Sequence, residues 1–209
     1  MTTEINWLRL QKDLQPKLLE GKINDAIEFC EKELNKIPQT DFHKILTKNL
    51  DHLIDPLILW INDFYKRVSQ DININAMYCE MNGFTINPDR WFIDLFAFDT
   101  DGGMEDLDWL ADWQNGHSTL PNSFTITGFE DLQTKYESKA NSYDDQGNST
   151  YDYSVENRNA DVYCQHIIVL RLQELFKNAI IIAKNKNYVW ADTPIIVTGH
   201  DWEMIYKTK

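Results

Sequence analysis

The spacing of hydrophobic residues predicts that the first third of the chain is helical. Six apolar residues recur at helix-like spacing, namely Trp7, Leu8, Leu10, Leu14, Leu18 and Leu19. Gly21 follows them as a stop signal, and Asn24 or Asp25 can cap a second helix that runs to about Lys36. Two helices are therefore expected before Pro38.

A longer apolar stripe follows and predicts a third helix. Its members lie three or four residues apart: Phe42, Leu46, Leu50, Leu53, Leu57, Ile61 and Phe64. Thr40 or Asp41 can cap the start of this helix. Pro56 lies inside the stripe. Because proline lacks the amide donor and clashes with the preceding turn, it should kink the helix or split it in two.

From about Ser69 the pattern changes to one typical of strands. Strand-like runs cover 74–82 and 91–98, and turn signals flank a short run at 84–86. We expect these three runs to form an antiparallel meander.

The run at 91–98 is apolar on both faces. One face carries Trp91, Ile93, Leu95 and Ala97, and the other carries Phe92, Asp94, Phe96 and Phe98. This strand is therefore expected to be central in its sheet, with cover on both sides.

The chain beyond this strand alternates between loops and short elements. Residues 99–103 form a predicted loop, and 105–113 can make a short helix with its aspartates outward. Residues 124–127 predict an edge strand, and 129–137 a helical turn or two.

The last third contains the strongest helix pattern. Residues 138–157 are rich in polar turn-formers and are expected to be a mobile loop. A long helix is predicted over about 160–184, and one or two strands over 194–206. The fold class expected is α+β, with N-terminal helices and one long late helix packed on an antiparallel sheet.

Composition narrows the class of molecule. The chain has 209 residues, 43% of them hydrophobic and 12% aromatic, so a single α+β domain spanning 1–209 can bury a substantial core. The formal net charge is −13. Nucleic acids and anionic membranes are bound through Lys and Arg, so neither is expected as a partner. The charge suits a basic protein partner, bound cations, or solubility alone.

No segment indicates secretion, a membrane span or a cofactor. The N-terminus has no basic region followed by an apolar one, and no apolar run approaches 18 residues. The three cysteines, Cys30, Cys79 and Cys164, are far apart and odd in number, so buried thiols in a reducing cytoplasm are expected. A phosphate-binding glycine loop is absent from the sequence, and no cofactor is expected.

Acidic and aromatic residues are concentrated between Arg90 and Lys135, a segment that contains no Lys or Arg. The residues predicted to bind a partner are Asp99, Asp101, Glu105, Asp106, Asp108, Trp109, Asp112 and Trp113. Aromatic side chains can anchor an interface, and carboxylates can steer a basic partner. The alternative is that the tryptophans fill the core while the acids are solvated.

Two acidic motifs suggest a competing function, a metal-dependent hydrolase. Asp99 and Asp101 alternate after a strand, as ligands of Ca²⁺ or Mg²⁺ do, although the motif lacks the EF-hand spacing. The alternative is a plain turn, which is the commoner role of such a motif because a sharp turn requires Asp and Gly. His200 and Asp201 are metal-ligating or acid–base types, yet successive strand residues face opposite ways. The sequence shows no nucleophile elbow.

Two other histidines are candidates for additional ligands. His117 and His166 are both possible donors, but no spacing ties either one to His200. His166 lies within the predicted long helix, where a histidine is more often a satisfied core residue than a ligand.

The chain resembles bacterial immunity proteins that neutralise polymorphic or contact-dependent toxins. The likeness rests on its small, acidic α+β character, on the stretch Trp91-Phe-Ile-Asp-Leu-Phe-Ala-Phe-Asp-Thr-Asp-Gly-Gly, and on the ending Gly199-His-Asp-Trp-Glu. The resemblance implies a non-enzymatic protein that binds a basic nuclease or similar toxin tightly and covers its active site.

Overall fold

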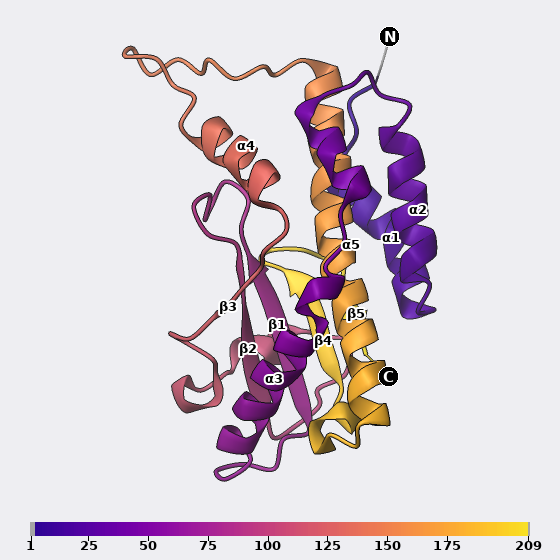
Figure 1. Ribbon diagram of the computed structural model, residues 1–209, viewed down its shortest axis with the longest axis vertical. Helices are drawn as coiled ribbons and strands as arrows, with labels where there is room; N and C mark the ends of the chain where they lie inside the picture. The colour runs from indigo at the N-terminus through magenta and orange to yellow at the C-terminus, as the bar shows by residue number, and fades with distance from the viewer. Residues whose placement is uncertain (1–2, 209) are drawn as a thin grey trace.

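The computed structural model describes residues 3–208 and shows an α+β fold (Figure 1). The α-helices are α1 (Trp7–Leu19), α2 (Ile23–Leu34), α3 (Ile54–Val68), α4 (Glu130–Ala140) and α5 (Val155–Asn185). Short 3-10 helices are η1 (Asp41–Thr47), η2 (Asp51–Leu53), η3 (Asp108–Ala111), η4 (Asn115–His117) and η5 (Val189–Asp192). The strands are β1 (Ala76–Asn82), β2 (Phe92–Phe98), β3 (Phe124–Thr125), β4 (Ile195–Gly199) and β5 (Tyr206–Lys207).

The sheet is mixed, where a wholly antiparallel sheet was expected. Its strand order is β3-β2-β1-β4-β5, and β1 pairs in parallel with β4 while the other pairings are antiparallel. The parallel pairing arises because α5 returns the chain along the sheet, so that β4 enters beside β1 in the same direction. β1 is therefore central, and β2 lies between β1 and the short edge strand β3.

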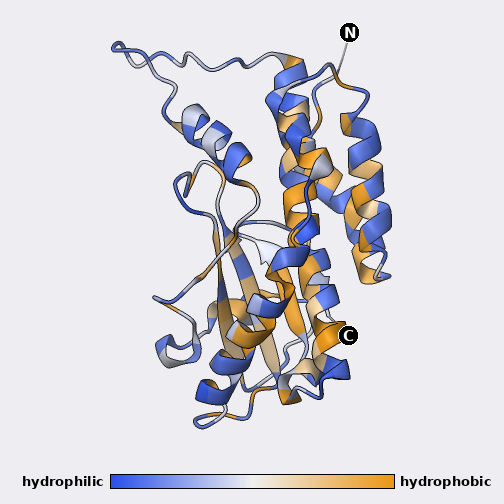
Figure 2. Cartoon of the chain, viewed as in Figure 1, coloured by the Kyte–Doolittle hydropathy of each residue, from blue (hydrophilic) through white to orange (hydrophobic). Residues whose placement is uncertain are grey.

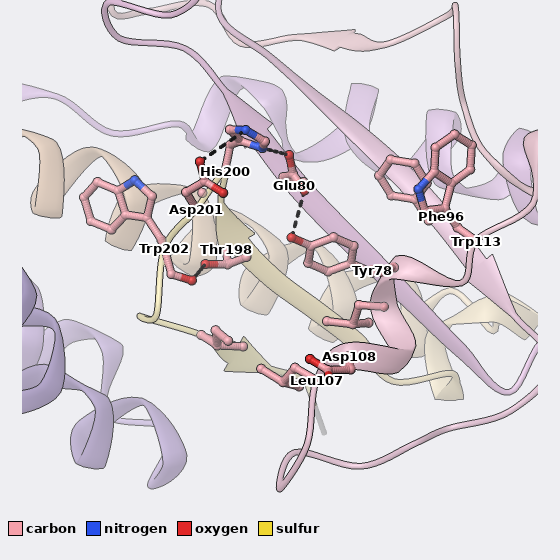
Figure 3. A pocket seen from close by; sticks show the side chains of 14 residues that line it. Tyr78, Glu80, Phe96, Leu107, Asp108, Trp113, Thr198, His200, Asp201 and Trp202 are labelled. Carbon is pink, nitrogen blue, oxygen red and sulfur yellow. Dashed lines mark hydrogen bonds and ion pairs between the residues drawn. The ribbon is translucent and has the colours of Figure 1, made fainter.

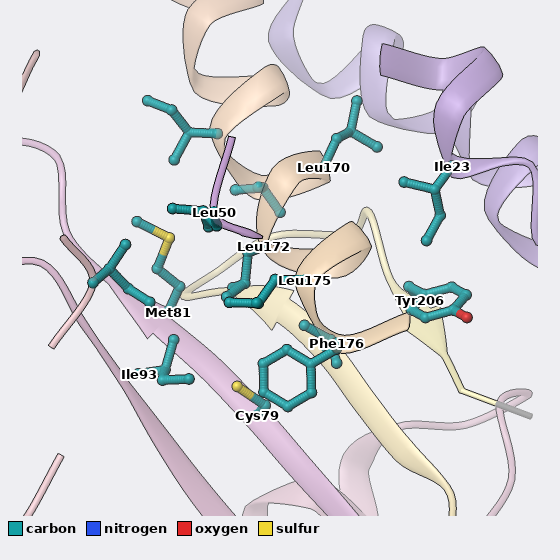
Figure 4. Packing of buried hydrophobic residues seen from close by; sticks show 14 of the residues in the cluster. Ile23, Leu50, Cys79, Met81, Ile93, Leu170, Leu172, Leu175, Phe176 and Tyr206 are labelled. Atoms are coloured by element: carbon teal, nitrogen blue, oxygen red, sulfur yellow. The ribbon is translucent and has the colours of Figure 1, made fainter. Parts of the chain in front are cut away.

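The core lies between α5 and one face of the sheet. Leu172, Leu175 and Phe176 of α5 pack over Cys79 and Ile93 (Figure 4). α1 and α2 lie on the other side of α5, which explains why this helix is apolar around much of its circumference (Figures 1 and 2). None of the helices within residues 3–208 is long and apolar enough to cross a membrane.

The predicted strand at 84–86 is wrong, because these residues form a turn. The amides of Ile86 and Asn87 both donate to the carbonyl of Gly83, and Phe84 has a left-handed φ of 56°. The ring of Phe84 packs against Trp91, so burial of an aromatic side chain outweighs the strand pattern.

The third predicted helix is split into η1, η2 and α3. Thr40 caps η1, as expected, and Lys48 is extended, which ends the first piece. Pro56 lies in the first turn of α3, where a missing amide donor leaves no helical bond unmade. The predicted helix at 105–113 is reduced to η3.

The segment between α4 and α5 extends beyond the end of the sheet (Figure 1). Tyr143 and Ser149 form an isolated antiparallel bridge, and the carboxylate of Asp144 accepts the amide of Asn148. The predicted loop at 138–157 thus begins inside α4 and ends inside α5. Its mobility stays a prediction.

Candidate functional site

The candidate site lies on the face of the sheet opposite α5. Strand alternation turns Tyr78 and Glu80 of β1 to this outer face, and the register places Tyr78 beside Phe96 and Glu80 beside Asp94. Thr198 of β4 lies next to Glu80 on the other side. Polar and aromatic side chains are thereby collected on one surface.

The two tryptophans of the acidic segment cover this outer face. The ring of Trp109 meets Phe98 edge-on at 4.9 Å, and Trp113 lies 5.0 Å from Phe96, both measured between ring centroids. A Cβ at Gly102 would lie 2.5 Å from the Trp109 ring, so the loop can approach only because residue 102 is glycine. Both tryptophans are half-buried, which gives the outer face the cover predicted for β2.

The six predicted acidic contact residues are all exposed. Asp101 is paired with Lys207, with Nζ 2.7 Å from Oδ2, and this pairing lowers the pKa of the Asp101 carboxyl. Within residues 3–208, no Lys, Arg or His side chain forms an ion pair with the other five, which are Asp99, Glu105, Asp106, Asp108 and Asp112. The segment therefore carries an uncompensated negative charge.

A groove of about 380 Å³ lies beside this segment, between η3 and the turn that follows β4 (Figure 3). His200 Nδ1 lies 2.5 Å from Glu80 Oε1, and the Tyr78 hydroxyl donates to Glu80 Oε2 at 3.0 Å. His200 Nε2 lies 3.5 Å from the Asp201 carboxylate. Burial, and then the nearby Glu80 charge, raises the pKa of Tyr78, so its hydroxyl stays protonated and remains a donor.

Buried polar groups fix the turn that carries His200. The Thr198 hydroxyl and the Gln173 side-chain amide both donate to the carbonyl of Met204, at 3.0 Å each. Gln11 Oε1 accepts the Met204 amide at 2.9 Å. Because these bonds are buried, the wall of the groove is set by the fold.

The two halves of the predicted metal site lie far apart. Asp99 follows Phe98, which pairs with Ala76, whereas His200 follows Gly199, which pairs with Met81. Those pairings are at opposite ends of β1, about 17 Å apart at about 3.3 Å per residue. Among residues 3–208, no group of three or more His, Cys, Asp or Glu side chains is placed to hold a metal ion.

The other two predicted histidine donors also lie outside the groove. His117 Nε2 lies 2.7 Å from Asp71 Oδ2. His166 is fully buried between Trp7 and Trp202, as expected for a core histidine, and burial lowers its pKa to about 4.

The three cysteines are buried and free, as predicted. Burial raises the pKa of all three thiols, that of Cys30 to about 12 and those of Cys79 and Cys164 well above the usual value. They are therefore poor nucleophiles.

Sequence reasoning missed Tyr78 and Glu80. The available signal was their alternation with the apolar Met77, Cys79 and Met81, which shows that one face of β1 carries polar groups. Comparisons of the chain with protein-family models, curated proteins and solved structures find no match.

Proposed function

We propose that this chain is a non-enzymatic binding protein for a basic protein, of the immunity or inhibitor type, and that residues 99–113 form its contact surface. The observation that carries the proposal is a group of five exposed carboxylates that form no ion pair with any of the residues 3–208, set beside the half-buried Trp109 and Trp113. Free carboxylates attract a basic partner from a distance, and the indole rings offer apolar area at its centre.

The first test is neutralisation of charge on this segment. The variant carries Asp99→Asn, Glu105→Gln, Asp106→Asn and Asp112→Asn, and it spares Asp101 because that carboxylate pairs with Lys207. The control neutralises four exposed carboxylates elsewhere that form no ion pair within the described part of the chain, namely Asp25, Asp63, Asp89 and Glu137. Both variants have the same net charge.

The partner to use is a basic protein encoded beside this gene whose toxicity is relieved by co-expression. We expect the segment variant to slow association about tenfold or more at low salt, while dissociation changes little, because exposed charges act mainly through steering. Stopped-flow measurements over a range of salt concentrations give both rates. Equal slowing by the two variants would leave only a general effect of net charge and contradict the proposed surface.

A further inference from the structure

The groove beside the acidic segment has the lining of a site for an organic cation. We propose that it receives the guanidinium of an arginine side chain from the basic partner, an inference that rests on the proposed function. The groove lies between Leu107 and Trp113 on one side and His200 to Trp202 on the other (Figure 3).

The charge of the lining is negative. Glu80, Asp108 and Asp201 contribute carboxylates, and His200 contributes an imidazole that contacts Glu80 and Asp201. Among residues 3–208, no Lys or Arg lines the groove. The Asp108 carboxylate has no ion pair within residues 3–208, and Asp201 extends into solvent with 85% of its side chain exposed. A cation that entered would meet the Asp108 carboxylate and the largely exposed Asp201 carboxylate, whereas both oxygens of Glu80 are already engaged by Tyr78 and His200.

The walls of the groove are aromatic. Tyr78 and Phe96 are stacked at 5.9 Å, Trp113 adjoins Phe96, and Trp202 stands at the other end. A guanidinium is planar, weakly hydrated and able to stack on rings while it bonds a carboxylate, whereas the ammonium of lysine is compact and strongly hydrated. The combination of rings and acids therefore favours arginine over lysine.

The groove is built before any ligand arrives. Tyr78 and His200 hold the two oxygens of Glu80, and the turn that carries Asp201 and Trp202 is anchored by Thr198. A Cβ at Gly199 would lie 2.8 Å from the Trp202 ring, so that ring is packed directly on the backbone. Ordering the site on binding thus costs little.

The test uses N-acetyl-arginine methylamide as the probe and N-acetyl-citrulline methylamide as its neutral isostere. Each is titrated into the ¹⁵N-labelled protein at 150 mM NaCl, and the indole NH signals are followed by NMR. We expect saturable shifts of Trp113 and Trp202 with the arginine probe at millimolar concentrations, and at least fivefold weaker binding of citrulline. The indole NH signal of Trp109, which does not line the groove, should not shift.

Two matched variants locate the binding. Asp108→Asn removes a lining carboxylate and should weaken arginine binding at least threefold, whereas Asp112→Asn removes an exposed carboxylate outside the groove and should not. Equal binding of citrulline, equal effects of the two variants, or no saturable shift would each overturn the proposal.

The proposed function and this inference fail in different ways. The segment variant, in which four carboxylates are neutralised, leaves the groove lining intact. Its affinity for the arginine probe should therefore stay within twofold, while its association with the partner slows. Arginine binding without charge-dependent partner association would refute the contact surface alone. Charge-dependent association without arginine binding would refute the groove alone.

Discussion

His166 is a buried ionisable side chain that couples the fold to pH. Its Nδ1 lies 2.7 Å from the Val162 carbonyl, so this nitrogen donates, and its Nε2 is buried. The neutral ring is compatible with this setting, but the imidazolium would add a charge between Trp7 and Trp202.

The pH dependence of stability follows from that burial. The pKa of His166 is about 4 in the folded chain against 6.5 as the ordinary value, so the unfolded chain binds the extra proton between these values. The titration of His166 therefore lowers the free energy of unfolding as the pH drops from about 6.5 towards 4. Raising the pH restores it. Between pH 7 and 5 the loss from this group should be about 2 kcal/mol.

Urea denaturation at both pH values measures this effect, and His166→Gln is the control. The variant should be less stable at pH 7, yet it should lose most of the pH dependence between 7 and 5. An unchanged dependence in the variant would assign the effect to other groups.

At the scale of elements, local sequence patterns correctly located the helices and strands that are largely buried. The predicted helix at 160–184 lies within α5, and the strand at 91–98 covers β2, because packing on more than one side leaves few polar positions. The strand prediction for 84–86 was wrong because these three residues pair with no strand in the described part of the chain. The ring of Phe84 packs instead against Trp91 and Tyr136.

The groove could not be predicted, since it depends on long-range pairing. Glu80 and His200 are 120 positions apart and meet because β1 pairs with β4 in parallel. No local pattern encodes the direction in which β4 re-enters the sheet. The acidic segment, in contrast, was recognisable from composition, although its aspartates and tryptophans lie on a loop and a short 3-10 helix.

α4 is attached to α5 by a buried polar cluster that offers a test of this element. The Tyr136 hydroxyl donates to Asp161 at 2.6 Å, and Lys139 and Gln165 also bond this carboxylate. Tyr136→Phe removes one buried hydrogen bond to a charged acceptor and should lower the free energy of unfolding by about 1–3 kcal/mol.

The matched control is Tyr143→Phe, which removes an exposed hydroxyl and should change the free energy of unfolding by less than about 0.5 kcal/mol. Urea midpoints of the two variants give the comparison. Equal midpoints would mean that the Tyr136 bond contributes nothing to the attachment of α4.

At the scale of the whole molecule, the net charge of −13 means that negatively charged groups on the surface repel one another. Screening that repulsion should stabilise the compact state, so raising NaCl from 10 to 150 mM should raise the melting temperature by a few degrees. The segment variant, with four fewer negative charges, should respond less. Thermal melts in one buffer at fixed pH, with the NaCl concentration as the only variable, measure this. A fall in melting temperature with salt would show that attractive ion pairs dominate instead.

The parallel pairing of β1 with β4 also matters while the chain is being made. On the ribosome, β1 and β2 emerge long before residues 195–199, which complete the centre of the sheet. Until then the amides and carbonyls along one edge of β1 lack their strand partner, and the apolar side chains of Met77, Cys79 and Met81 are not yet covered by α5. Open strand edges are templates for pairing with other chains. We therefore expect the nascent polypeptide to be prone to pairing with other chains, and to be a target for a chaperone, until β4 pairs with β1.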